Sequence, residues 1–395
     1  MPRVRLGWIV LIASVVASGS GWASPKKQPP AAAFEDPCLD DACTNHALDG
    51  FRAALAAQRS HTAKHPLRIS YFGDSLTADD EITHELRREL QAELGDGGPG
   101  FVFAVAPHRL CQHRALARIV GEGWTSYGVS TIVPPDHLLG LGGTAEGDGV
   151  IRFVPTAKTV RSVDVHYLAQ PHGGSFDVTA DGSVVAHVAT AADHKEAAFI
   201  AAEVPEGTKR IELRASGRVR LFGVALEGPT GAVVDNLGIV NATAKQMRNN
   251  ILDDHLHNEL DHRASDLVVV MLGTNEAEWL QAKTAGMTEH EKLFGELLAT
   301  IRRTHASCLV VSPLDQIDWR DDKMPPRTSV PAMVEAQRRA ALANGCAFWD
   351  VYTWMGGKGS SMGWYNRGLV AKDFQHPTSQ GAEMLAAALH AGLTN

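Results

Sequence analysis

Three features are scarce or missing in this sequence of 395 residues: cysteines, blocks of basic residues and long apolar runs. The net charge of −8, without a basic block, argues against a nucleic-acid-binding surface. Beyond the N-terminal segment, no stretch is long and apolar enough to cross a membrane. The composition, with 44% hydrophobic and 21% charged residues, is globular, and the length suffices for one large domain and a smaller one.

The five cysteines do not have the spacing of zinc ligands. Cys38 and Cys43 are close enough in sequence to pair in an oxidising compartment, although the sequence does not decide whether they do. Cys308 and Cys346 lie in apolar runs, which predicts unreactive residues of the core.

The N-terminal segment has the pattern of a secretory signal peptide. Arg3 and Arg5 precede an apolar run from Leu6 to Ala17, and small residues follow it. An uncleaved anchor is the alternative, but the run is short for a membrane span. We predict cleavage near Ala23 and an exported protein, periplasmic or extracellular, with no transmembrane segment in the mature chain. Its net charge becomes −10, because residues 1–23 contain two arginines and no acidic residue.

Strands and helices alternate in two parts of the chain, which predicts a parallel sheet covered by helices on both faces. Sites in such sheets form beyond the carboxyl ends of the strands. Strands are predicted at 67–72, 98–107, 231–240, 266–272, 307–313 and 346–351, and helices at 46–60, 79–94, 241–262, 288–304, 330–344 and 379–391.

Residues 150–226 differ in texture, because short alternating segments there are separated by Gly, Pro and Asp. This pattern predicts an antiparallel β-sandwich whose strands are buried on one face. In one segment, Val163, Val165 and Tyr167 alternate with Ser162, Asp164 and His166.

Two segments at predicted strand ends carry the groups of a nucleophilic site. Ser75 lies in "SYFGDSLTADD", and Asp373 and His376 lie in "KDFQHPTSQG". A serine hydroxyl is a weak nucleophile until a base takes its proton, and imidazole is a suitable base. A carboxylate three residues before the histidine can hold its other ring nitrogen. Alternatively, Ser75 and Asp373 only cap helices.

Attack on an ester also needs donors for the oxyanion. The Ser75 amide at a helix start, the Gly238 amide and the Asn275 side chain of "MLGTNEAEW" are candidates. Separately, each has a simpler interpretation, as a turn glycine or an Asx-turn. Their joint position after strands favours one acyl-transfer site.

These segments resemble the four motif blocks of the SGNH/GDSL hydrolases, which here read "FGDSLT", "NLGIVNA", "GTNE" and "DFQH". The resemblance covers roughly residues 65–120 and 229–395. It implies a flavodoxin-like three-layer α/β/α sandwich, with Ser75 as nucleophile and with Asp373 and His376 completing the triad. It also implies an oxyanion hole made by Ser75, Gly238 and Asn275.

Residues 85–102 and the segment "WYNRGLVAKDFQHPTSQG" further resemble exported bacterial peptidoglycan O-acetylesterases, which carry an inserted, carbohydrate-binding-like β-sandwich of jelly-roll type. This implies removal of acetyl groups from an acetylated cell-wall polysaccharide through an acetyl-Ser75 intermediate, with no metal and no cofactor. A lipase or general ester hydrolase, a glycan O-acetyltransferase and a non-catalytic glycan-binding protein remain as alternatives. The expected division is signal peptide 1–23, linker 24–37, hydrolase domain 38–120 and 229–395, and inserted domain 121–228.

One further pattern has two interpretations. His255, Glu259 and His262 have the spacing of one helix face, which would suit a metal ion. The interpretation we favour is the solvated side of a helix.

Overall fold

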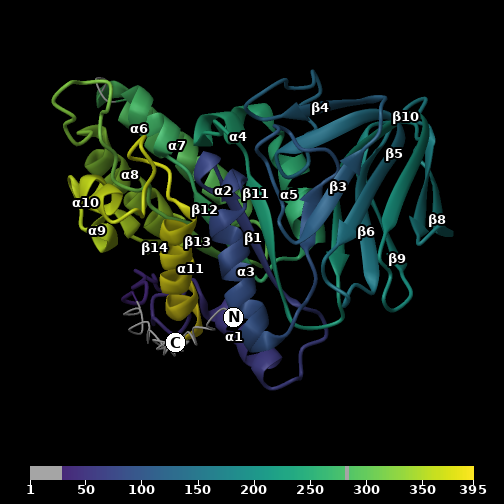
Figure 1. Cartoon of the computed structure of the whole chain (residues 1–395), viewed down its shortest axis with the longest axis horizontal. Helices are drawn as coiled ribbons and strands as arrows, with labels where there is room; N and C mark the ends of the chain where they lie inside the picture. Colours follow the sequence, from purple (N-terminus) through teal and green to yellow (C-terminus); the bar gives the residue numbers. More distant parts are fainter. Residues whose placement is uncertain (1–28, 281–283) are drawn as a thin grey trace, which may run out of the picture.

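The computed structural model describes residues 29–280 and 284–395 and consists of two sheets lying side by side (Figure 1). One sheet has five parallel strands, and the other has nine strands that pair in antiparallel fashion. The predicted signal peptide lies outside the described residues, as do residues 24–28 of the predicted linker. No helix within the described ranges has the length and apolar character of a membrane span.

The parallel sheet has the strand order β11-β1-β12-β13-β14, which in chain order is 2-1-3-4-5. Its strands are almost entirely buried, as expected where helices cover both faces. The chain reverses its direction of travel across the sheet between β1 and β12, where ligand sites of such folds form. The strands are β1 (Leu67–Gly73), β11 (Ala232–Gly238), β12 (Leu267–Met271), β13 (Ser307–Val311) and β14 (Ala347–Trp349).

The helices form the two outer layers and enclose two hydrophobic clusters. In β1, Ile69 and Tyr71 belong to one cluster and Phe72 to the other, so the side chains alternate between the layers. One layer contains α1 (Asp49–Arg59), α3 (Glu81–Leu94) and α11 (Ser379–Thr394). The other contains α4 (Ala244–Asn250), α5 (Asp253–Arg263), α7 (Thr284–Ile301) and α8 (Ser329–Ala343). The predicted three-layer α/β/α sandwich is confirmed.

Short helices complete the parallel-sheet part. They are α2 (Ser75–Ala78), α6 (Thr274–Leu280), α9 (Val351–Met355) and α10 (Ser360–Asn366). The single helix predicted at 241–262 is two helices, α4 and α5, because the backbone is extended at Ile251 and Leu252.

The antiparallel sheet is organised around β10 (Ile211–Glu227), which pairs with four other strands. Two of the short alternating segments of the sequence, 209–216 and 219–228, form this one strand, which has an irregularity between Ala215 and Val219. Such bulges bend a strand without ending it. The other strands are β2 (Gly100–Phe103), β3 (Leu116–Val120), β4 (Trp124–Gly128), β5 (Gly143–Pro155), β6 (Ser162–Ala169), β7 (Ser175–Ala180), β8 (Ser183–Ala189) and β9 (Glu196–Glu203).

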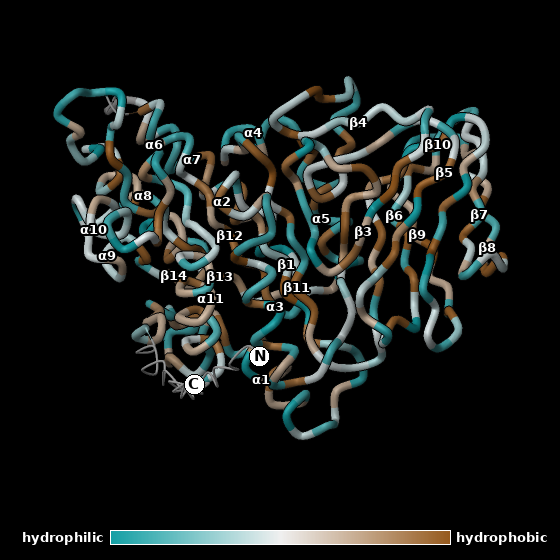
Figure 2. The backbone as a smooth tube through the Cα atoms, in the orientation of Figure 1, coloured by the Kyte–Doolittle hydropathy of each residue, from teal (hydrophilic) through white to brown (hydrophobic). Residues whose placement is uncertain are grey.

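The antiparallel β insertion is thus confirmed, and it has a hydrophobic cluster of its own. In Figure 2 the apolar residues of β5, β6 and β10 are seen as brown segments of the strands in this part of the molecule. The strand predicted at 98–107 is present at Gly100–Phe103 as β2, but its predicted place in the parallel sheet is wrong, because it pairs with β10 in the antiparallel sheet.

The face of β6 that carries the polar residues is not fully exposed to solvent. Val163 and Val165 are buried in the insertion, as predicted, but His166 on the opposite face is also fully buried. Helix α5 lies between the two sheets (Figure 1), and Glu259 of α5 contacts His166. The favoured interpretation of this α5 face as solvated is therefore wrong for His255 and Glu259, which are buried because the helix packs between the sheets, whereas His262 is exposed.

Two disulfides are present. Cys38 pairs with Cys43, with their Cα atoms 4.9 Å apart. Cys308 and Cys346 are fully buried in the core, as predicted, but they pair in a disulfide, which the sequence analysis did not predict. The reason is the strand order: Leu309 of β13 lies opposite Ala347 of β14, so the preceding cysteines meet. The two cysteines are 38 residues apart in sequence, so the sequence alone does not show that they are neighbours in space.

The described part of the predicted linker, residues 29–37, lies against the parallel-sheet part. The Ala32 amide donates to the Ala388 carbonyl, and Glu35 and Phe348 exchange backbone hydrogen bonds beside β14.

Candidate active site

Ser75 is the first residue of α2, immediately beyond the carboxyl end of β1. The cap of this helix is Asp74, whose side chain accepts a hydrogen bond of 3.0 Å from the Leu76 amide. The capping role is thus filled by Asp74, and the Ser75 hydroxyl has another partner. Gly73 permits the tight turn, because a side chain there would collide with Thr77.

The Ser75 hydroxyl lies 2.8 Å from Nε2 of His376, and Nδ1 of the same ring lies 2.8 Å from Oδ2 of Asp373. Oδ1 of Asp373 accepts from the amides of Gln375 and His376. The loop is closed by a hydrogen bond from the Ala371 amide to the His376 carbonyl. With the proton on Nδ1 donated to Asp373, Nε2 accepts from the serine hydroxyl, which is the arrangement of a Ser-His-Asp triad.

The electrostatics of the pair suit a base at neutral pH. Partial burial opposes ionisation of Asp373, but the hydrogen bonds from the His376 ring and from nearby amides outweigh it and lower the pKa to about 2. Burial of His376 favours its neutral form, yet the hydrogen bond to Asp373 and the charges of Asp373, Asp74 and Asp79 raise its pKa above the usual value. Asp373 is therefore an anion whenever His376 takes a proton.

Asn275 follows β12 in the first turn of α6, and its Nδ2 donates to the Ala242 carbonyl at 3.0 Å. This contact brings Asn275 beside the loop that follows β11. Because an amide group has two hydrogens, one remains for an oxyanion.

Gly238 ends β11 and lies opposite Gly73 in the register of the sheet. A Cβ atom at Gly238 would lie 2.5 Å from the Ala78 amide nitrogen, so this glycine permits the close packing of α2. Its own amide already donates to Oδ1 of Asn236 at 3.0 Å.

A residue that the sequence analysis did not single out lies in the same loop. Asn241 has a left-handed backbone, with φ of 62°, and no hydrogen bond from its N–H is found within the described part of the chain. The signal was present in the "NLGIVNA" block, because asparagine adopts this conformation more readily than most residues. The Asn241 amide is thus a candidate oxyanion donor beside Asn275.

Glu276, next to Asn275, is buried and contacts the start of α4. Its Oε1 accepts from the Ala244 amide at the start of α4, and burial raises its pKa to about 8. By contrast, Trp279 in the last turn of α6 is 59% exposed.

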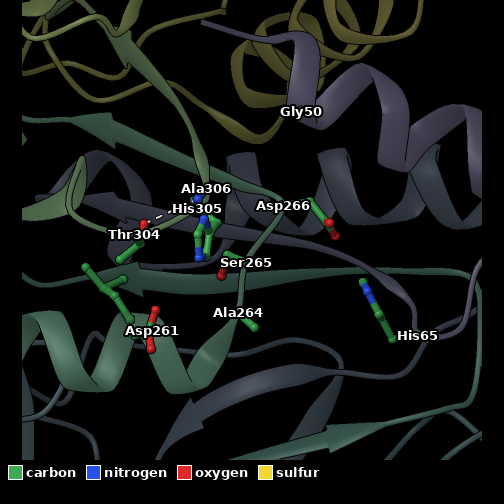
Figure 3. Close-up of a pocket in the computed structure, with 10 residues that line it drawn as sticks. Gly50, His65, Asp261, Ala264, Ser265, Asp266, Thr304, His305 and Ala306 are labelled. Atoms are coloured by element: carbon green, nitrogen blue, oxygen red, sulfur yellow. Dashed lines mark hydrogen bonds between the residues drawn. The ribbon is translucent and has the colours of Figure 1, made fainter.

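Figure 3 shows a separate cavity of about 190 Å³, lined in part by His65, Asp261, Asp266 and His305. Residues 264–266 precede β12 and residues 304–306 precede β13, so this cavity lies at the amino ends of the strands. Ser75 lies at the carboxyl ends, and the cavity therefore belongs to the opposite edge of the sheet.

Two groups of residues, among those that the structure describes, bring potential metal-binding atoms within 4.8 Å of one another. One contains the disulfide-bonded Cys38 and Cys43, and the other contains Asp164, His166 and His262. Neither includes a residue of the Ser75–His376–Asp373 arrangement.

Residues 211–384 match the model of the GDSL-like Lipase/Acylhydrolase family. The chain belongs to the GDSL/SGNH hydrolase family. This GDSL/SGNH hydrolase is a carboxylic ester hydrolase, as the family is. The matched range contains Gly238, Asn275, Asp373 and His376, while Ser75 precedes it because the insertion separates the serine from the other blocks.

The fold of this GDSL/SGNH hydrolase is shared with a solved structure described as a peptidoglycan O-acetylesterase in action. The TM-score is 0.73 at 22% identity, over 86% of this chain and 93% of that one. A catalytic mutant of an acetylxylan esterase from Geobacillus stearothermophilus is similar at a TM-score of 0.31 and 18% identity, over 41% of this chain and 73% of that one. No curated protein matches the chain.

Proposed function

We propose that this GDSL/SGNH hydrolase is a serine esterase in which Ser75 is the nucleophile, His376 the base and Asp373 the residue that orients the base. The observation that carries the proposal is the continuous pair of 2.8 Å contacts from the Ser75 hydroxyl through His376 to Asp373. A capping role for Ser75 does not account for it, because Asp74 caps the helix.

In the proposed reaction His376 takes the proton of Ser75 while the Ser75 oxygen attacks the ester carbonyl. Asp373 stabilises the imidazolium that forms. The imidazolium then gives its proton to the departing alcohol oxygen, which leaves acetyl-Ser75. Next, His376 takes a proton from water, whose oxygen attacks the acetyl group. The imidazolium then returns this proton to the departing Ser75 oxygen, which releases acetic acid, ionised to acetate in solution, and restores the free Ser75 hydroxyl.

The oxyanion donors in this scheme are the Ser75 amide, the Gly238 amide and the Asn275 side chain. The Gly238 amide has to exchange its bond to Asn236 to take part. The Asn241 amide needs no exchange, and we add it as a fourth candidate donor. Preorganised donors of this kind contribute most when their hydrogens are free before the substrate arrives.

The proposed substrate is an O-acetyl ester of a cell-wall polysaccharide, with peptidoglycan as the first choice. The shared fold with a protein described as a peptidoglycan O-acetylesterase supports this choice. The openness of the site also supports it, because the side chains of Asp373 and His376 are each 36% exposed and leave access for a polymer. Export, proposed from the N-terminal sequence, is supported by the two disulfides.

The test compares acetate release from O-acetylated peptidoglycan, from acetylated xylan and from esters of longer acyl chains, with the Ser75→Ala variant as the blank. We expect the highest kcat/KM on peptidoglycan. Preference for long acyl chains would establish a lipase instead. Acetyl transfer to an added oligosaccharide in place of acetate release would establish an acetyltransferase. Glycan binding without turnover would establish a binding protein.

A further inference from the structure

A second histidine–carboxylate cluster lies where α5 packs against β6, and the esterase scheme does not use it. Asp164 and His166 are two residues apart on β6, so their side chains share the face that α5 covers. His262 lies in the last turn of α5. Nε2 of His262 is 2.8 Å from Oδ2 of Asp164, and Nε2 of His166 is 3.9 Å from the same oxygen.

His166 is the unusual member of this cluster. Its side chain is fully buried, and its Nδ1 is 2.7 Å from Oε2 of Glu259. Its Nε2 has no hydrogen-bond partner within the described residues, although it points to the side where Asp164 and His262 lie. A buried polar atom without a partner is costly, and a bound ion is one of the ways in which proteins satisfy such an atom.

Neither protonation state of His166 satisfies this atom without a third component. If Nδ1 donates its proton to Glu259, Nε2 carries a lone pair aimed toward the Asp164 carboxylate and the His262 ring. If both nitrogens carry protons, the Nε2 proton has no acceptor within hydrogen-bond distance, because the Asp164 oxygen is 3.9 Å away. A cation bound between the three side chains satisfies the lone pair and the carboxylate together.

The chemistry of the donor set indicates the ion. Two imidazole nitrogens and one carboxylate oxygen suit zinc and its neighbours among the divalent transition metals. Donor atoms of a tetrahedral zinc ion lie about 3.3 Å apart, and the observed separations of 2.8 and 3.9 Å bracket that value. Glu259 on Nδ1 of His166 is the outer carboxylate that metal-bound histidines commonly have.

The surroundings hold the two rings in place and leave the cluster partly open to solvent. Phe199 stacks on His262 with ring centres 3.7 Å apart, and Phe101 contacts His166 edge-on. Side-chain exposure is 32% for His262 and 26% for Asp164, so a water molecule can reach the fourth position. Arg263, the nearest cation in sequence, is engaged by Asp235 and Glu227.

We propose that Asp164, His166 and His262 form a binding site for one zinc-class divalent ion, which joins β6 of the insertion to α5 of the hydrolase part. The Glu259 carboxylate positions His166 for this ion. The site is independent of the proposed esterase reaction.

The test is a zinc titration of the full chain, stripped with a chelator, in competition with a chromophoric indicator. We expect one ion per chain and a midpoint of thermal unfolding that rises with zinc. Glu259→Gln should weaken zinc binding by about 10- to 100-fold, and His262→Ala by more. Cobalt in place of zinc should give the visible absorption bands of a four-coordinate ion in the wild type and not in His262→Ala.

His187→Ala is the matched control, because His187 also contacts a carboxylate, Asp177 at 2.6 Å, in the insertion but lies outside the cluster. It should bind zinc as the wild type does. Asp164→Asn, a nearly isosteric change at a partly exposed residue, replaces His262→Ala if the latter does not fold. The proposal is overturned if the wild type binds no stoichiometric zinc, or if the cluster variants bind it as tightly as His187→Ala; the cluster is then only a hydrogen-bonded contact between the two parts.

Discussion

Two of the histidines whose Nδ1 contacts a carboxylate invite comparison: His376, which contacts Asp373 at 2.8 Å, and His166, which contacts Glu259 at 2.7 Å. They differ in what lies beyond Nε2. The His376 ring meets the hydroxyl of Ser75, whereas Nε2 of His166 has no hydrogen-bond partner among the described residues. The first ring is 36% exposed and the second is fully buried.

The difference shows that the carboxylate–histidine unit does not by itself define a function. It fixes the tautomer and aims a lone pair, and the group that receives this lone pair decides the chemistry. A serine hydroxyl becomes a nucleophile, while two further ligand atoms make a metal site. The two clusters should therefore respond to different substitutions.

The largest effect is expected at the proposed nucleophile. Ser75→Ala removes the atom that forms the acetyl intermediate, so kcat on an activated acetate ester should fall by roughly 10⁶-fold. The measurement is a spectrophotometric assay of the purified protein. Ser379→Ala is the control, because Ser379 is an exposed serine at the start of α11 and should retain activity. Substantial turnover by the Ser75 variant would remove the basis of the mechanism.

A smaller loss is expected from Asp373→Asn. The amide keeps the size of the side chain but no longer fixes the catalytic tautomer of His376, so kcat should fall by about 10⁴-fold. Glu259→Gln makes the same change at the other histidine and should leave the esterase kcat near that of the wild type. A parallel loss in both variants would contradict the separation of the two clusters.

Asn275→Ala should lower kcat by about 10²- to 10³-fold, which is the usual cost of one oxyanion donor. KM for a small ester should change little, since the donor acts on charge that develops in the transition state. An unchanged kcat would indicate that backbone amides alone stabilise the oxyanion and that Asn275 is not one of the donors. Kinetics over a range of ester concentrations separate the two parameters.

The esterase cluster could be predicted from sequence because its signals are local. Ser75 follows a clear strand, and Asp373 and His376 lie within one loop turn. The strand order that brings these segments together is the common one for alternating strands and helices. The oxyanion donors were harder to predict, because they depend on details of one loop. These details are the hydrogen bond from the Gly238 amide to Asn236 and the left-handed backbone of Asn241.

The second cluster could not be predicted in the same way. The alternation in β6 gave the correct two faces, but it did not show that α5 covers the polar one. The spacing of residues in α5 suggested a metal-binding helix face that includes His255. In the structure, Nε2 of His255 instead accepts a hydrogen bond from the Gly140 amide. The pairing of Cys308 with Cys346 was missed for the same physical reason: both depend on which elements become neighbours in space.

The smallest effect concerns the pH dependence of the esterase. Carboxylates near His376 favour its protonated form and raise its pKa, so the acid limb of kcat/KM should lie above the usual range of imidazole. Asp79→Asn removes one of these charges while keeping an oxygen for the Glu81 amide. The limb should then move to lower pH by a fraction of a unit, because a weaker negative field makes the imidazolium less stable. Asp177→Asn, on β7 of the insertion, should leave the profile unchanged. A limb that stays in place in Asp79→Asn, or moves upward, would show that the Asp79 charge does not set the pKa of the base.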